Sequence, residues 1–179
     1  MNAEKWTEAS IGRAVSKGLF KASTLVVPCC GWTGHECDLL VVTKDLRIID
    51  VEIKISRADL KADLAKDKWW KHRPWSRRAK FTDDAAKTRV DWPPKVWKHY
   101  YCMPADIWDD NLLPHIPATS GVLLLERTAG ALGVAFRSIR ACKPNRDAQR
   151  INASDAVDIA RLPNLRMWDG LHREARRTP

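Results

Sequence analysis

Residues 49–56 read Ile49-Asp50-Val51-Glu52-Ile53-Lys54-Ile55-Ser56, in which apolar and polar side chains alternate without a break. Successive side chains of a β-strand point to opposite faces, so the alternation predicts a strand with one apolar and one polar face. On the polar face the Glu52 carboxylate and the Lys54 ammonium would lie side by side, about 6.5–7 Å apart along the strand. We therefore expect a strand over roughly 47–55, followed by a helix that Ser56 caps.

A second strand is predicted just before it, at Cys37-Asp38-Leu39-Leu40-Val41-Val42-Thr43. Asp38 is embedded among apolar residues there, and an ionised group in such a place is costly unless it has a partner or a role. The short connection to residue 47 indicates a hairpin. Asp38 and Glu52 are therefore candidates for one site formed by two neighbouring strands.

The length of the hairpin loop decides whether these two acids can meet. Opposed residues of an antiparallel pair point to the same face. A two-residue turn would place Asp38 opposite Val51, facing away from Glu52, whereas the three-residue loop Lys44-Asp45-Leu46 would place Asp38 opposite Glu52. We predict an odd-length loop, or a bulge with the same effect.

Two carboxylates and an ammonium in this arrangement suit metal-assisted hydrolysis. Hard cations such as Mg²⁺ take carboxylate and carbonyl oxygens, and Asp38 and Glu52 could bind one ion between them. The ion polarises a phosphoryl oxygen and lowers the pKa of a bound water. Lys54 would hold or help deprotonate that water, or neutralise charge in the transition state. The alternative is a solvated Glu–Lys pair on a polar strand face.

The remaining elements are read from periodicity and turn residues. A helix is expected from about residue 3 to 17, with Glu8 on its apolar stripe, where it either serves the site or reaches solvent. Further strands are expected at 25–28, 96–103, 122–125 and 133–137, and the first helix after the hairpin is expected to extend toward Trp70. The tail from about 152 reads as a basic helix interrupted by Pro163. The chain is expected to form a single domain.

A helix with Glu8, a strand with Asp38, a strand with Glu52-Ile53-Lys54 and a further helix, in that order, resemble the PD-(D/E)XK nuclease superfamily. The resemblance covers roughly residues 8–126, and it is closer to the MmcB-like DNA-repair branch of that superfamily. It includes these later segments: 52–60, Asp63 with Lys68-Trp69, 98–104, Pro117 and 121–124.

The resemblance implies an α/β (α+β) fold with a restriction-endonuclease-like αβββαβ core, a mixed central sheet flanked by helices. It also implies a Mg²⁺-dependent deoxyribonuclease, with Mn²⁺ as a substitute, that hydrolyses phosphodiester bonds in DNA repair, recombination or phage DNA processing. Asp38 and Glu52 would be metal ligands and the Ile53 carbonyl a third. Lys54 would be catalytic, and Glu8 would be an auxiliary acid.

The charge balance points to the same class of partner. The chain has 31 Lys and Arg against 22 Asp and Glu, a net charge of +9, which favours a polyanion such as DNA. A basic insertion is expected at about 72–94, either as a solvated loop or as a surface that contacts DNA. Its candidate nucleic-acid-binding residues are Arg73, Trp75, Arg77, Arg78 and Lys80.

Two other functions stay open. The cluster Cys29, Cys30, His35 and Cys37 could bind zinc, although its spacing fits the usual zinc ligand pairs badly and favours buried strand thiols with a turn histidine. The chain could also bind nucleic acid through a nuclease-like fold without cutting it. Five cysteines, an odd number, and no long apolar run indicate a cytoplasmic protein with reduced thiols and no membrane partner, and a homodimer is possible.

Overall fold

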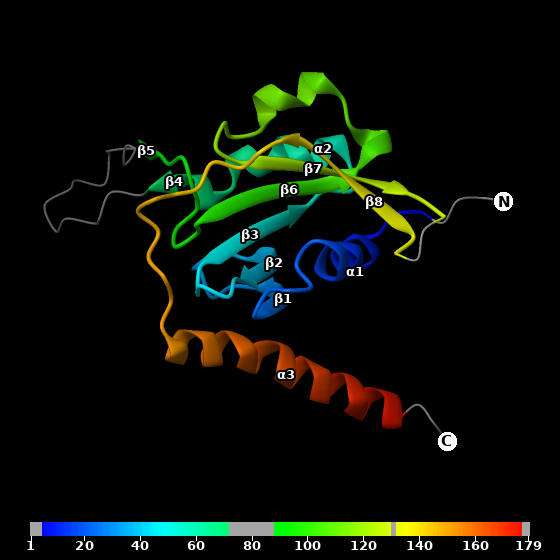
Figure 1. The fold of residues 1–179 in the computed structure, drawn as a ribbon, viewed down its shortest axis with the longest axis vertical. Helices are drawn as coiled ribbons and strands as arrows, with labels where there is room; N and C mark the ends of the chain where they lie inside the picture. The colour runs from blue at the N-terminus through cyan, green and yellow to red at the C-terminus, as the bar shows by residue number, and fades with distance from the viewer. Residues whose placement is uncertain (1–4, 72–87, 130–131, 177–179) are drawn as a thin grey trace, which may run out of the picture.

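A six-stranded mixed sheet forms the centre of the protein in the computed structural model, which describes residues 5–71, 88–129 and 132–176 (Figure 1). The main elements are α1 (Glu8–Gly18), β1 (Leu25–Cys30), β2 (Cys37–Val42), β3 (Ile48–Ile53), α2 (Arg57–Ala62), β6 (Lys98–Pro104), β7 (Gly121–Arg127), β8 (Val134–Arg140) and α3 (Ala153–Ala175). The smaller elements are η1 (Asp63–Ala65), η2 (Asp67–Trp69), β4 (Trp70–Lys71), β5 (Thr88–Arg89), η3 (Ala105–Ile107) and η4 (Asp110–His115).

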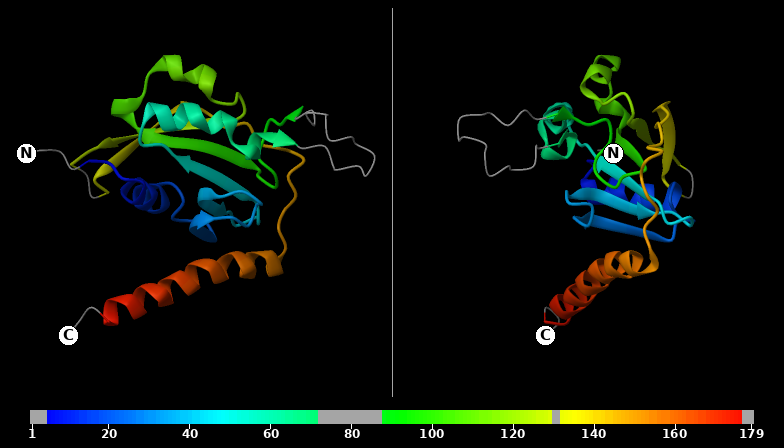
Figure 2. Two further views of the ribbon diagram at one scale, coloured as in Figure 1. Left: turned by 180° about the vertical axis from the view of Figure 1, so that it is seen from behind. Right: turned by 90° about the vertical axis from the view of Figure 1, so that its left-hand side faces the viewer.

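The strands lie in the order β1-β2-β3-β6-β7-β8. β1, β2 and β3 form an antiparallel meander, β3, β6 and β7 are parallel, and β8 is antiparallel to β7. Figure 2 shows helical segments on both sides of this sheet. The αβββαβ order, the mixed sheet and the flanking helices are those expected from the sequence.

The two faces of β3 bury different kinds of residue. Its apolar face packs, together with β2, against α1 in a cluster that contains Ile11, Val15, Leu39, Val51 and Ile53. The opposite face of the sheet carries two further apolar clusters, one closed by α3 and one by α2 and η4. The polar residues of β3 lie on that second face, so apolar layers surround them.

The β2–β3 connection is the three-residue loop Lys44-Asp45-Leu46. Thr43 N–H donates to the Arg47 carbonyl and Leu46 N–H donates to the Thr43 carbonyl, each at 3.0 Å. Leu46 takes the left-handed conformation, with φ of 59°. Leu39 pairs with Val51 in the resulting register, and its continuation places Asp38 opposite Glu52. The predicted odd-length loop is confirmed, with leucine where glycine is usual.

Two helix predictions are wrong in extent. α2 ends at Ala62 rather than near Trp70, because the chain turns into η1 and η2 where the Asp63 carboxylate is held in a buried cluster described below. α3 continues through Pro163 instead of breaking there. A proline removes one intrahelical donor, and the other i→i−4 hydrogen bonds continue on both sides.

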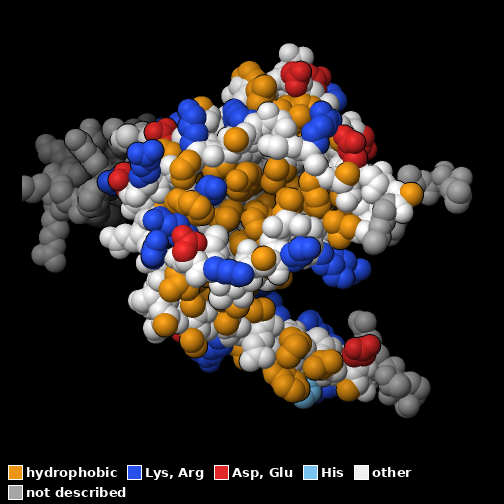
Figure 3. Space-filling view, viewed as in Figure 1, with side chains coloured by type: hydrophobic (Ala, Val, Ile, Leu, Met, Phe, Trp, Pro, Cys, Tyr) orange, Lys and Arg blue, Asp and Glu red, His pale blue; other side chains and the backbone are white. Residues whose placement is uncertain are grey.

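α3 is only partly packed on the sheet. Ile159, near its start, is fully buried, whereas Leu165, Met167 and Trp168 are about half exposed. Figure 3 shows apolar side chains along the outer part of this helix. No helix within the described ranges has the length and apolar character needed to cross a membrane.

Candidate active site

The polar face of β3 is buried. Asp50 and Glu52 have 0% exposure and Lys54 has 1%. Burying an ionised group is costly unless it is paired, so these side chains require partners inside the protein. The alternative of a solvated Glu–Lys pair is therefore wrong for this strand.

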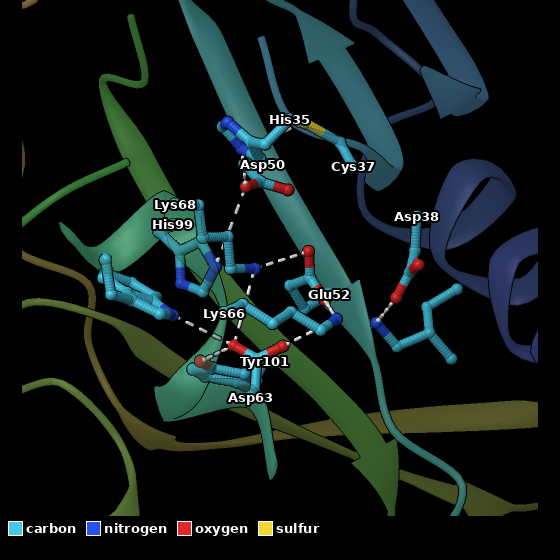
Figure 4. A network of polar contacts seen from close by, with 12 residues as sticks. His35, Cys37, Asp38, Asp50, Glu52, Asp63, Lys66, Lys68, His99 and Tyr101 are labelled. Carbon is cyan, nitrogen blue, oxygen red and sulfur yellow. Dashed lines mark hydrogen bonds and ion pairs between the residues drawn. The ribbon is translucent and has the colours of Figure 1, made fainter. Parts of the chain in front are cut away.

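Glu52 is surrounded by three lysines. Lys54 Nζ lies 2.9 Å from Glu52 Oε2, and Lys68 Nζ lies 2.6 Å from Oε1. Lys66, whose side chain is 48% exposed, approaches Oε2 at 3.4 Å. Lys66 and Lys68 come from the segment after α2, so this segment brings two cations to a carboxylate that the strand has buried (Figure 4).

Asp63 is the second carboxylate of this charged cluster. Its Oδ1 lies 3.0 Å from Lys54 Nζ and 2.9 Å from Lys66 Nζ. Its Oδ2 accepts hydrogen bonds from the Tyr101 hydroxyl and, at 3.2 Å, from the Trp69 indole N–H. β3 therefore supplies one carboxylate, Glu52, and η1 supplies the other, Asp63, and the lysine ammonium groups contact both.

The pKa values follow from this pairing. Burial alone would lower the pKa of Lys54, but the charges of Glu52 and Asp63 outweigh it and raise the pKa above its usual value. Burial would raise the pKa of Asp63, and Lys68 and Lys54 outweigh it and lower the pKa. Lys54 is thus a fixed cation at neutral pH and is not suited to accept a proton.

Asp38 reaches the same strand from β2. Its Oδ2 accepts a hydrogen bond of 2.7 Å from the Ile53 N–H, between Glu52 and Lys54. Burial, and then the charge of Glu52, raise the pKa of Asp38 to about 6. A carboxylate whose ionised form is disfavoured in this way is one that a nearby cation would stabilise.

A cavity of about 540 Å³ opens beside α1 at this point. Glu8, Asp38 and Ile53 are among the residues that line it. Glu52 and Lys54 are not among the lining residues, and Asp38 is the link between this cavity and the charged cluster.

The predicted site residues therefore form two connected groups. Glu8, Asp38 and Ile53 meet at the cavity, and Glu52 and Lys54 meet in the charged cluster. The nucleic-acid-binding candidates Arg73, Trp75, Arg77, Arg78 and Lys80 lie outside the described residues.

Sequence reasoning assigned no role to Asp63, Lys66, Lys68 or Tyr101. A sequence signal for Tyr101 was its spacing of two residues from His99, which puts both on one face of a strand. In the structure His99 pairs with Asp50 and Tyr101 with Glu52, so they continue the polar face of β3. Lys66 carries no pattern that separates it from any surface lysine. Only the path of the chain after α2 brings it to the cluster.

Residues of the cysteine-rich segment lie at the other end of this polar face. Cys29 is exposed, and Cys30 and Cys37 are buried. His35 Nε2 lies 3.0 Å from Asp50 Oδ2 and 3.6 Å from Cys37 Sγ. The structure thus joins His35 and Cys37 to an aspartate of β3, a partner that spacing along the chain does not reveal.

Comparisons with known proteins bear on the fold alone. No family model matches the chain, and no curated protein matches it. A solved structure of the SPO1766 protein from Silicibacter pomeroyi, described as of unknown function, is similar over 96% of this chain and 94% of its own, with a TM-score of 0.53 and 16% identity.

Proposed function

We propose that this protein is a metal-dependent nuclease that hydrolyses phosphodiester bonds in DNA, with Asp38, Glu52 and Lys54 at its active site. The observation that carries the proposal is the Asp38–Ile53 hydrogen bond, which holds an acid with a pKa raised to about 6 at the point of β3 where Glu52 and Lys54 are adjacent. A surface ion pair would need no such burial and no second acid.

The donor set fits Mg²⁺ or Mn²⁺. Asp38, Glu52 and the Ile53 carbonyl would hold the ion, which when bound polarises a phosphoryl oxygen and activates a water. Lys54, kept protonated by its carboxylate neighbours, would neutralise negative charge that develops on the phosphate. Glu8, at the same cavity as Asp38, would position water or the ion's outer ligands. The net charge of +9 favours the approach of a polyanion.

The test is Mg²⁺- or Mn²⁺-dependent cleavage of a panel of labelled DNAs that includes single strands, flaps, junctions and supercoiled plasmid. Asp38→Asn keeps the shape and an acceptor for the Ile53 N–H but removes the charge that binds the ion. We expect it to reduce the cleavage rate by about 100-fold or more, equivalent to roughly 2.7 kcal/mol of transition-state stabilisation. DNA affinity, measured by fluorescence anisotropy, should be retained.

The matched control is Asp106→Asn, an equal change of charge at an exposed position of η3. It should cleave as the unaltered protein does. Cleavage at the unaltered rate by Asp38→Asn would remove Asp38 from the active site and with it the proposal.

A second candidate function is binding of nucleic acid without cleavage. It is favoured by the pairing of Glu52, both of whose oxygens already lie within 3.0 Å of a lysine ammonium, Lys54 at 2.9 Å and Lys68 at 2.6 Å. Such a carboxylate is internally neutralised and gains less from an ion. DNA binding that persists with no cleavage of any substrate, in Mg²⁺ and in Mn²⁺, would favour this candidate.

A further inference from the structure

The side chains of His35, Cys37 and Asp50 gather at the buried upper end of the β3 polar face, next to the charged cluster around Glu52 (Figure 4). One ligand atom from each of the three lies within 4.8 Å of the others. His35 comes from the turn before β2, Cys37 from β2 and Asp50 from β3, so the hairpin itself assembles the group.

The geometry does not suit a cysteine nucleophile. A Cys–His–Asp relay needs the two ring nitrogens of the histidine to face different partners. Here His35 Nε2 faces both Cys37 Sγ, at 3.6 Å, and Asp50 Oδ2, at 3.0 Å, and its Nδ1 is buried without a hydrogen-bond partner. A tetrahedral ion bound about 2.0–2.3 Å from each ligand keeps neighbouring ligands about 3.3–3.7 Å apart, close to these separations.

His99 gives an independent indication of a cation. It is fully buried, its Nδ1 is bonded to the Ser120 hydroxyl at 2.9 Å, and its Nε2 lies 3.8 Å from Asp50 Oδ2 without a hydrogen bond. A buried imidazole nitrogen and a carboxylate oxygen that face each other without a hydrogen bond are an arrangement that a positive ion stabilises.

Charge balance leads to the same conclusion. Among the described residues, the ion pairs of Asp50 within 4.0 Å are with His35 and His99, and the Lys68 ammonium acts on it from further away. Its second oxygen, Oδ1, is buried and has no hydrogen-bond partner. A divalent ion would neutralise the Asp50 carboxylate together with a Cys37 thiolate, so the buried group would carry no net charge.

We propose that His35 Nε2, Cys37 Sγ and an Asp50 carboxylate oxygen form a zinc-type site, with His99 facing the same carboxylate. Nitrogen, sulfur and carboxylate oxygen together are the donors that Zn²⁺ takes and that Mg²⁺ does not. Its ligands are different residues from Asp38, Glu52 and Ile53 of the proposed nuclease site, although Asp50 and His99 also offer ligand atoms within 4.8 Å of Glu52. The zinc-type site ties the turn before β2 to the central strand.

The test is the metal content of full-length protein expressed with added zinc and dialysed against metal-free buffer, together with the absorption spectrum after replacement of zinc by Co²⁺. We expect one zinc per chain and a thiolate-to-cobalt charge-transfer band. Cys37→Ser should abolish that band and weaken zinc binding by at least about 10–100-fold, the loss caused even by changing a group that only hydrogen-bonds to a metal ligand. Cys30→Ser is the matched control, because Cys30 is buried and pairs with Cys37 across the sheet, and it should keep both metal and band.

His35→Gln is the second variant, at a side chain that is 11% exposed and whose loss disturbs the core less. It should also lose zinc, and Asp38→Asn should retain it, which separates failure of this site from failure of the nuclease proposal. Metal well below one ion per chain in the unaltered protein, a charge-transfer band that survives Cys37→Ser, or an equal loss in Cys30→Ser would each overturn the site.

Discussion

Asp38 Oδ2 accepts a hydrogen bond of 2.7 Å from the backbone N–H of Ile53, which fixes the end of β2 to the residue between Glu52 and Lys54. A carboxylate so placed is half-buried and close to a second acid. The negative charge of Asp38 therefore lowers the free energy of unfolding, and a bound cation could restore it. The effect of this charge on stability can be measured.

Asp38→Asn should make the metal-free protein more stable above about pH 6. The folded-state pKa of Asp38 is raised from 3.8 to about 6, so the unaltered protein loses stability as the pH rises between those values, and the amide does not. We expect a gain on the order of 1 kcal/mol, or 2–4 °C in Tm, since partial exposure screens the effect. Thermal unfolding at several pH values checks this, and the difference should vanish below about pH 4.

Lys54→Met should destabilise the fold strongly. It leaves Glu52 and Asp63 buried with one cation fewer, and removal of one partner from a buried ion pair costs about 3–5 kcal/mol. Lys66→Met is the matched control, because Lys66 contacts the same two carboxylates but is 48% exposed, and its loss should cost less than about 1 kcal/mol. Urea denaturation measures both, and equal costs would contradict the pairing described here.

Leu46→Val should destabilise the protein more than Leu46→Gly, although valine keeps more apolar surface. Leu46 has a φ of 59°, which β-branched residues disfavour and glycine adopts freely. Glycine loses the packing of a half-buried side chain but removes roughly 1–2 kcal/mol of backbone strain, so its net effect should be small. Equilibrium unfolding of the two variants ranks them, and the reverse order would show that packing dominates at this loop.

Neutralisation of Arg77 and Arg78, both outside the described residues, should weaken binding to DNA of any sequence by a similar factor. Each phosphate contact removed should lower the slope of log affinity against log salt by about one. Anisotropy titrations of Arg77→Gln with Arg78→Gln at several salt concentrations test this. Unchanged affinity and slope would mean that the segment does not contact the DNA backbone.

The alternation in residues 49–56 determined the two faces of β3, because a strand has a strict period of two. The same rule, applied to the hairpin, predicted the three-residue loop and the register that sets Asp38 opposite Glu52. These features are local, since backbone geometry over a few residues decides them. The burial of that polar face is not local, and the alternation alone was equally compatible with a solvated ion pair.

Only the tertiary structure decided what surrounds those side chains. Lys66 and Lys68 reach Glu52, and Asp63 reaches Lys54, because the chain leaves α2 after Ala62 and turns back toward β3. His35 and Cys37 meet Asp50 because the hairpin folds the turn before β2 onto β3. A buried charge must find its partners wherever the fold brings them, and pairing between residues distant in sequence has no period that a single chain reveals.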